Sequence, residues 1–248
     1  MNSLSIILFG FNESKTIKST FDNTLKVLKK ISSDYEIIII DDGSTDNSKE
    51  VIKDIILNNK LVFSIFNKTN IGIGMTLVKG YNLASKKYIC SIPLDGQFNP
   101  LELLKIKKIH IQKNNFISFF RSKNYQYSFF RKFLSKMNFL FNFFILGILL
   151  KDVNWVKIYN KDHLKKLNLS LKSSLVETEI CSKLIISKIH PIEVKSNYLN
   201  RTHGKSKVNT YKILSMVIFE IPHLVYIILM FRIKITYMKI MQKKIFFY

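Results

Sequence analysis

The first hundred residues alternate short apolar runs with segments in which apolar residues recur every three to four positions. The run Glu36–Ile40 ends in four consecutive isoleucines, which is typical of a strand buried on both faces. The periodic segments between the runs have the pattern of amphipathic helices. This βαβ order predicts an α/β protein with an open, mostly parallel sheet. The expected elements are strands at Leu4–Phe9, Glu36–Ile40, Leu61–Phe66 and Tyr88–Ile92 and helices at 17–31, 47–56 and 75–85, with a capping box of Asn47 and Glu50.

Beyond Pro100 the alternation is looser, and the stretch Phe129–Leu150 is apolar on most sides. It predicts one long helix, either in the protein core or in a membrane interface. Around it we expect a helix from Pro100 to about His110, strands at Asn115–Phe120, Val153–Tyr159 and Pro191–Tyr198, and a helix at Leu175–Lys188.

A second strongly apolar segment is Ile213–Phe231. Crossing a bilayer takes roughly 20 apolar residues, and Glu220, Pro222 and His223 interrupt this segment. We therefore expect a helix that lies in or against the bilayer. The basic residues that follow it suit an anionic cytoplasmic leaflet. They are Arg232, Lys234, Lys239, Lys243 and Lys244. We therefore expect two parts of the chain, a domain at residues 1–210 and a membrane-associated helix and tail at residues 211–248.

Charge and cysteine usage restrict the partners and the compartment. A formal net charge of +22 favours phosphates and acidic lipid as partners, whereas no aromatic–basic recognition motif supports nucleic acid. Cys90 and Cys181 lie far apart in apolar surroundings, which predicts buried, reduced thiols. Met1–Ile7 is too short an apolar run for a signal peptide. We expect the protein at the cytoplasmic face of the cell membrane.

Paired acids follow the run of isoleucines, in the sequence Asp41-Asp42-Gly43-Ser44-Thr45-Asp46. In open α/β sheets, ligands bind at the carboxyl ends of the strands. Carboxylates there can accept hydrogen bonds from ribose hydroxyls and from a base N–H, and Gly43 permits a tight turn. An acidic N-cap turn would account for Ser44 and Asp46 but not for the two acids before them.

Other strand ends carry polar residues too. Phe9-Gly10-Phe11-Asn12-Glu13 is predicted to line the same crevice, and Asn70–Met75, taken alone, indicates a structural turn before a helix. Within Pro93–Pro100, Asp95 and Gln97 are candidate ligands for a divalent cation. Magnesium often uses few protein carboxylates together with substrate phosphates.

Together these motifs resemble glycosyltransferase family 2, which has the GT-A fold, and within it the polyprenyl-phosphate sugar synthases. The family patterns P-x-Y-N-E, D-D-G-S-x-D, N-x-G-x-g and D-x-D-g-Q-x-x-P match residues 9–13, 41–46, 70–74 and 93–100, with Pro93 in place of the first aspartate of the last. The resemblance implies a Rossmann-like domain with helices on both faces of the sheet and a Mg²⁺ or Mn²⁺ cofactor. It implies a nucleotide-sugar donor bound by Phe9, Phe11, Glu13, Asp41, Asp42 and Asp95.

The resemblance extends to about residue 210. Asn154-Trp155-Val156-Lys157 stands where the family has G-F-R, and the segment from Arg201 to Lys207 resembles R-x-x-G-x-S-K. A solvated basic loop is the alternative for that segment, and solvent exposure is the alternative for Arg121 and Arg131. The resemblance implies that Asp95, Arg121 and Arg201 are catalytic and that the diphosphate or acceptor phosphate is clamped by Arg121, Arg131, Arg201 and Lys207.

The predicted reaction is inverting transfer of a sugar from a nucleotide diphosphate to a membrane-associated acceptor. A lipid phosphate acceptor is already anionic, whereas a sugar hydroxyl requires a base, for which Glu177, Glu179 and His203 are candidates. A cell-surface glycan acceptor, such as lipopolysaccharide or capsule, is one alternative. A sugar-nucleotide-binding protein without catalysis is another, and the oligomeric state stays open, a homo-oligomer included.

Overall fold

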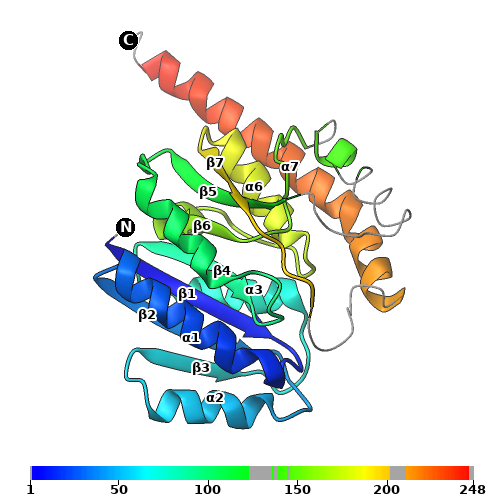
Figure 1. Ribbon diagram of the computed structural model, residues 1–248. Helices are drawn as coiled ribbons and strands as arrows, with labels where there is room; N and C mark the ends of the chain where they lie inside the picture. Colours follow the sequence, from blue (N-terminus) through cyan, green and yellow to red (C-terminus); the bar gives the residue numbers. More distant parts are fainter. Residues whose placement is uncertain (1, 123–135, 137–138, 144–145, 202–210, 246–248) are drawn as a thin grey trace.

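A seven-stranded sheet of order β3-β2-β1-β4-β6-β5-β7 runs through the computed structural model (Figure 1). The structure describes residues 2–122, 136, 139–143, 146–201 and 211–245. Strand β6 is antiparallel to β4 and β5, and the other neighbouring strands are parallel. The strands are β1 (Ser3–Gly10), β2 (Asp34–Asp41), β3 (Val62–Phe66), β4 (Tyr88–Pro93), β5 (Asn115–Arg121), β6 (Lys157–Asn160) and β7 (His190–Ser196).

Helices cover both faces of the sheet, as expected for this class of fold. One face carries α1 (Ser14–Ile31), α2 (Ser48–Leu57) and the 3₁₀-helix η1 (Pro100–Lys108). The other carries α3 (Ile73–Leu83), α5 (Lys161–Lys165), α6 (Val176–Ile186) and α7 (Tyr211–Ile245). Residues of β1 alternate between the two cores: Leu4, Ile6 and Leu8 enter one, and Ile7 and Phe9 enter the other. The predicted α/β architecture is confirmed.

A buried carboxylate on β2 is fully hydrogen-bonded within this framework. The Glu36 carboxylate accepts hydrogen bonds from the Ser5 hydroxyl at 2.6 Å and from the Ser85 amide and hydroxyl at 2.6 and 2.8 Å. Burial acts to raise the pKa of Glu36, but these hydrogen bonds outweigh it and lower the pKa. Cys90 and Cys181 are buried and free of disulfide, as predicted.

Two helices differ from expectation, one in the residue that caps it and one in its helix type. Asn47 makes no side-chain cap at α2; instead the Asp46 carboxylate accepts from the Ser48 amide at 3.1 Å, so the capping box with Glu50 does not form. The helix after Pro100 is a 3₁₀-helix ending at Lys108. Its buried positions Pro100, Leu103 and Ile106 recur every three residues, the period of that helix.

The predicted helix 129–150 ends before Leu146. Residues 136 and 139–143 are helical, whereas residues 146–150 are not. In this last stretch Leu146, Ile148 and Leu150 are buried and the residues between them are exposed, so the spacing is that of extended chain. Gly147 has φ of +68°, a conformation outside the helical region. The rest of the stretch lies outside the described residues.

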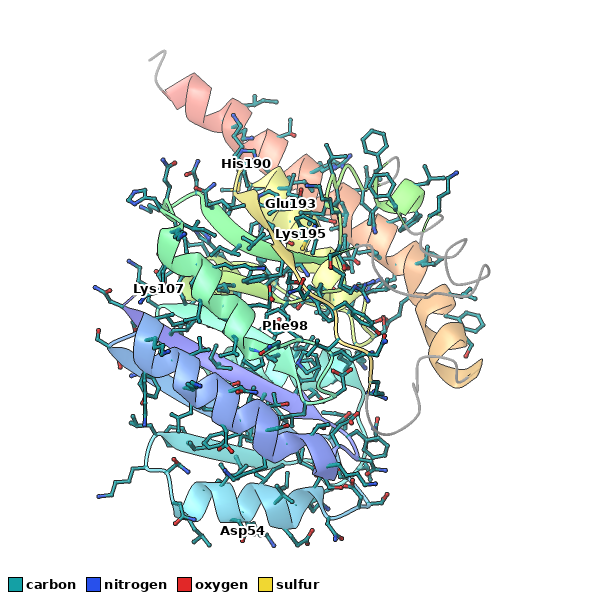
Figure 2. All side chains as sticks on the ribbon, in the orientation of Figure 1. Asp54, Phe98, Lys107, His190, Glu193 and Lys195 are labelled. Atoms are coloured by element: carbon teal, nitrogen blue, oxygen red, sulfur yellow. The ribbon has the colours of Figure 1, made fainter. Side chains whose placement is uncertain are left out.

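Two predicted strands have different bounds. Residues 153–156 form a turn, and β6 starts only at Lys157. The turn brings the Val153 and Trp155 carbonyls to the buried Lys157 ammonium, which explains why the segment is not extended. The last strand ends at Ser196. Figure 2 shows its residues Glu193 and Lys195 along β7, the outermost strand on that side of the sheet.

Helix α7 is longer than the apolar segment that predicted it and continues through Pro222. Leu224 and Ile228 of α7 are buried in the core on the α3 side of the sheet, and α7 packs against α6. Figure 1 shows the C-terminal turns of α7 extending beyond the body of the molecule. Among the described residues, no helix combines the length and apolarity that crossing a membrane requires.

Candidate active site

A cavity of about 510 Å³ lies at the carboxyl ends of β1 and β4, a size that suits a small-molecule ligand. Segments between Phe9 and Arg201 contribute to its wall. It is lined by Phe9, Gly10, Phe11, Glu13, Asp42, Asn70, Gly72, Ile73, Thr76, Leu77, Ser91, Pro93, Leu94, Asp95, Gln97, Arg121, Asn154, Trp155, Val156, Ser174, Glu177 and Arg201. The sheet topology explains this convergence, because parallel strands end at one edge.

Hydrogen bonds join the loops that follow β1 and β2. Asn12 adopts a left-handed conformation, with φ of 56°, and its side-chain oxygen accepts from the Thr45 amide at 2.8 Å. The Asn12 amide donates to the Ser44 hydroxyl at 2.8 Å, and the Glu13 amide donates to the Ser48 hydroxyl at 3.1 Å. These bonds fix Glu13 at the cavity wall.

The two acids at the end of β2 have different surroundings. Asp41 is buried and accepts from the Ser44 amide at 3.0 Å, so it closes its own turn and does not line the cavity. Asp42 lines the cavity and accepts from the amides of Ile71 and Gly72, both at 3.0 Å. Asp42 therefore also holds the loop that enters α3.

Glycine is required at position 43 of this turn. Gly43 has φ of +77°, and a Cβ atom there would lie 2.5 Å from the backbone carbon of Thr69. Any larger residue would push the loop before α3 away from the turn after β2.

Asp95, Glu13 and Arg201 form a charged cluster in the cavity. The Arg201 guanidinium donates to the Glu13 carboxylate at 2.7 Å and to the Asp95 carboxylate at 3.3 Å. Burial raises the pKa of Asp95; the Gln97 amide and Arg201 only partly offset this effect.

The donor set for a divalent cation is small. Among the residues that the structure describes, no three His, Cys, Asp or Glu side chains gather into a metal-binding group. Asp95 supplies a carboxylate and Gln97, which follows it by two residues, supplies an amide oxygen at the same wall. One carboxylate fits a magnesium-type ion that takes its remaining ligands from substrate phosphates and water.

Arg121 lines the cavity, and its guanidinium is bound by residues outside the cavity lining and by aromatic rings. Its Nε and Nη2 atoms donate to the Asp152 carboxylate at 2.6 and 3.0 Å, which is a two-point ion pair. The guanidinium also lies over the Trp155 ring, with 4.9 Å between its carbon and the ring centroid, and 5.9 Å from the Tyr198 ring. These contacts fix the side chain in one orientation at the wall.

Sequence reasoning missed a buried network beneath the cavity. The Glu177 carboxylate accepts from the hydroxyls of Tyr81 and Tyr159 at 2.5 and 2.7 Å and pairs with Lys157 at 3.2 Å. Burial and the neighbouring carboxylate of Glu177 raise the pKa of both tyrosines, so they stay protonated donors. Burial acts to lower the pKa of Lys157, but the neighbouring groups, with Glu177 first among them, together outweigh it and raise the pKa, so the ammonium stays charged. The sequence signals for it were Glu177, named as a candidate base, and the stretch ending in Lys157 that replaces the family's G-F-R, but neither predicted the pairing of the two residues.

Neither of the other two candidate bases is among the described residues that line the cavity. Glu179 is fully buried, pairs with Lys183 at 2.5 Å and accepts from the Leu171 amide, so it lies away from the cavity. His203 lies outside the described residues. So do Arg131 and Lys207 of the predicted phosphate clamp. The structure gathers the remaining predicted residues at one cavity, except Asp41: Phe9, Phe11, Glu13, Asp42, Asp95, Gln97, Arg121 and Arg201.

Solved structures similar to this chain share its fold. Glucosyl-3-phosphoglycerate synthase from Mycobacterium tuberculosis, in complex with Mn²⁺, UDP and glucosyl-3-phosphoglycerate, superposes with a TM-score of 0.63 at 14% identity, over 88% of this chain and 79% of that one. The same enzyme in complex with UDP gives a TM-score of 0.63 at 16% identity, over 92% and 80%. The protein is therefore a mixed α/β domain of the GT-A type.

The family model for glycosyl transferase family 2 matches residues 5–170. The chain belongs to this family. Its curated relatives include the undecaprenyl-phosphate 4-deoxy-4-formamido-L-arabinose transferases of Proteus mirabilis, 29% identical over 55% of this chain and 42% of that protein, and of Aeromonas hydrophila, 24% identical over 86% and 65%. The chain thus spans less than two thirds of the length of these relatives.

Proposed function

We propose that the protein transfers a sugar from a nucleotide-diphosphate sugar to a polyprenyl phosphate, with inversion at the anomeric carbon. The observation that carries the proposal is the meeting of Glu13, Asp42 and Asp95 with Arg121 and Arg201 in one cavity. Carboxylates for a nucleoside and a metal, next to guanidinium groups for phosphates, are the groups this chemistry requires. The names of the curated relatives support the lipid phosphate as the acceptor.

The donor's nucleoside occupies the side of the cavity next to β1 and β2. Phe9 and Phe11 supply apolar ring surface there, and Asp42 and Glu13 supply acceptors for hydroxyl and N–H groups. Asp41 contributes by fixing the turn that presents Asp42, since its carboxylate is bonded to the Ser44 amide. This assignment refines the predicted nucleoside site, in which both aspartates contact the ligand.

The diphosphate lies toward Asp95. Asp95 and Gln97 are the residues that would hold Mg²⁺ or Mn²⁺, and the similar solved synthase contains Mn²⁺ together with UDP. A bound cation neutralises charge on the diphosphate oxygens and makes it a better leaving group. Arg201 stands beside Asp95, where it can bind the same phosphates, and Arg121 offers a second guanidinium at the cavity wall. In the transfer, an acceptor oxygen bonds to the anomeric carbon as the bond from that carbon to the diphosphate breaks.

The state of Glu177 favours an acceptor that needs no base. Its carboxylate lines the cavity, yet it already accepts from two tyrosine hydroxyls and pairs with Lys157. Taking a proton from a sugar hydroxyl would require it to give up part of this network. A phosphate oxygen is anionic before the reaction, so it attacks without proton transfer. This argument disfavours the glycan acceptor.

We propose a membrane surface as the location, with residues 1–210 as the transferase domain and 211–248 as its membrane-contacting extension. Many large apolar side chains of α7 are exposed: Phe219 is 82% exposed and Tyr237 62%. The exposed Lys234 and Lys239 lie on the same helix and suit anionic lipid at the cytoplasmic face, whereas Arg232, expected there too, donates to the Leu146 carbonyl at 2.6 Å. An apolar helix surface with basic residues is typical of interfacial binding.

The test compares Asp95→Asn with wild type in a transfer assay with detergent-solubilised polyprenyl phosphate and a panel of nucleotide-sugars, each with Mg²⁺ or Mn²⁺. We expect at least a hundredfold loss of transfer, on the order of 3 kcal/mol, because the group assigned to the cation loses its charge. Asp54→Asn is the matched control, since Asp54, labelled in Figure 2, is an exposed residue of α2 and does not line the cavity. Transfer at wild-type level by a folded Asp95→Asn protein would refute the metal assignment. Nucleotide binding without transfer by the wild type would favour a binding protein that lacks catalysis.

A further inference from the structure

Glu220 is the single acidic residue between Leu199 and the end of the chain, in the middle of an otherwise apolar stretch of α7. Its two carboxylate oxygens accept hydrogen bonds from consecutive backbone amides of the segment that precedes α6. The distances are 3.3 Å to the Lys172 nitrogen and 3.1 Å to the Ser173 nitrogen. Helix α7 thus holds this segment through one side chain.

The same segment contacts α3 on its other side. Gly74, in the first turn of α3, approaches it so closely that a Cβ atom would lie 2.1 Å from the Ser173 carbonyl oxygen and 2.3 Å from the Lys172 carbonyl oxygen. The segment is therefore fixed between Glu220, which accepts from its amides, and Gly74, which packs on its carbonyls. A shift of the segment displaces the first turn of α3, because no space separates the two backbones.

Both ends of this contact reach the cavity. Ser174 is in the cavity wall, and its carbonyl accepts from the Glu177 amide as α6 begins. On the α3 side, the Ile71 and Gly72 amides donate to Asp42, the acid proposed to contact the nucleoside. A continuous set of contacts, from the Glu220 carboxylate through two backbone segments to the Asp42 carboxylate, therefore connects α7 to the donor side of the cavity.

We propose that Glu220 is a positioning residue that sets the donor side of the cavity from the C-terminal helix. It fixes residues 172–174, these fix the first turn of α3, and that turn fixes the loop bonded to Asp42. The identity of the ligand in this inference rests on the proposed function. Since α7 is also the helix proposed to contact the membrane, the side chain ties the donor site to the element that meets lipid.

The experiment measures backbone amide exchange in the full chain for wild type, Glu220→Ala, Glu220→Gln and the control Glu50→Gln, which removes an exposed charge on α2. In Glu220→Ala we expect about tenfold faster exchange at Ile71 and Gly72, which Glu220 does not touch. Glu220→Gln keeps one acceptor oxygen, so its exchange rates at Ile71 and Gly72 should fall between those of wild type and Glu220→Ala. The exchange rates of Glu50→Gln should match those of wild type. Unchanged exchange at Ile71 and Gly72, with faster exchange only at Lys172 and Ser173, would overturn the proposal. If Glu220→Ala does not fold, Glu220→Gln alone decides on the same amides.

A second measurement separates positioning from general loss of structure. With UDP and Mn²⁺ as the probe, the Kd of Glu220→Ala should rise about tenfold and that of Glu220→Gln less, while Glu50→Gln keeps the wild-type Kd. An unchanged Kd in both Glu220 variants counts against the inference. If wild type binds neither UDP nor another nucleoside diphosphate, the proposed function fails, and amide exchange at Ile71 and Gly72 still decides the role of Glu220.

Discussion

The ion pair of Lys157 and Glu177 offers a sharp test of how the interior beneath the cavity is stabilised. The Lys157 side chain is fully buried, and its ammonium contacts the Glu177 carboxylate together with the Val153 and Trp155 carbonyls. Lys157→Met removes the cation at similar side-chain length and leaves Glu177 buried with only two tyrosine hydroxyls. Breaking a buried pair from one side costs about 3–5 kcal/mol, because a charge stays in the interior without its partner.

For a domain of this size that cost corresponds to a fall in Tm of about 6–20 °C. The assay is thermal unfolding followed by the fluorescence of Trp155, the single tryptophan of the chain, which is buried next to the pair. Combining Lys157→Met with Glu177→Gln removes both charges. We expect the double variant to be more stable than the sum of the two single changes predicts, by about 1–3 kcal/mol. A fall of less than about 2 °C for Lys157→Met, or strictly additive effects, would refute the reasoning.

Two further outcomes are expected. The lowered pKa of Glu36 means that its ionised form stabilises the fold above its unfolded pKa near 4.5, and that this contribution is lost as pH falls through the lower folded value. Glu36→Gln should therefore have a lower Tm than wild type at neutral pH, and the difference in Tm should shrink on acidification. Thermal unfolding of both proteins across pH measures this difference. Arg121→Lys keeps the charge but loses the two-point pair with Asp152, so we expect kcat/KM to fall about tenfold, or ~1.4 kcal/mol, with Tm little changed. Equal kcat/KM for Arg121→Lys and wild type would show that orientation of the guanidinium does not matter.

The central sheet and the location of the site follow from the amino-acid sequence alone. Four isoleucines in a row can be buried only between two helix layers, and a parallel sheet places the residues after its strands at one edge. For this reason Glu13, Asp42 and Asp95 could be assigned to one crevice before any distance was known. Local motifs at strand ends carry this information, because each motif directly follows its strand.

Which polar residues face one another depends on how the elements pack in three dimensions. Asp41 and Asp42 are adjacent and chemically identical, and hydrogen bonds to Ser44 and to the loop before α3 distinguish the turn residue from the cavity residue. The partners Lys157 and Glu177, like Glu220 and Ser173, are separated along the chain, and periodicity says nothing about such pairs. Hydrophobic spacing fixes the face of an element that is buried, but the opposing element selects the contacts, and its position depends on the packing of the whole domain.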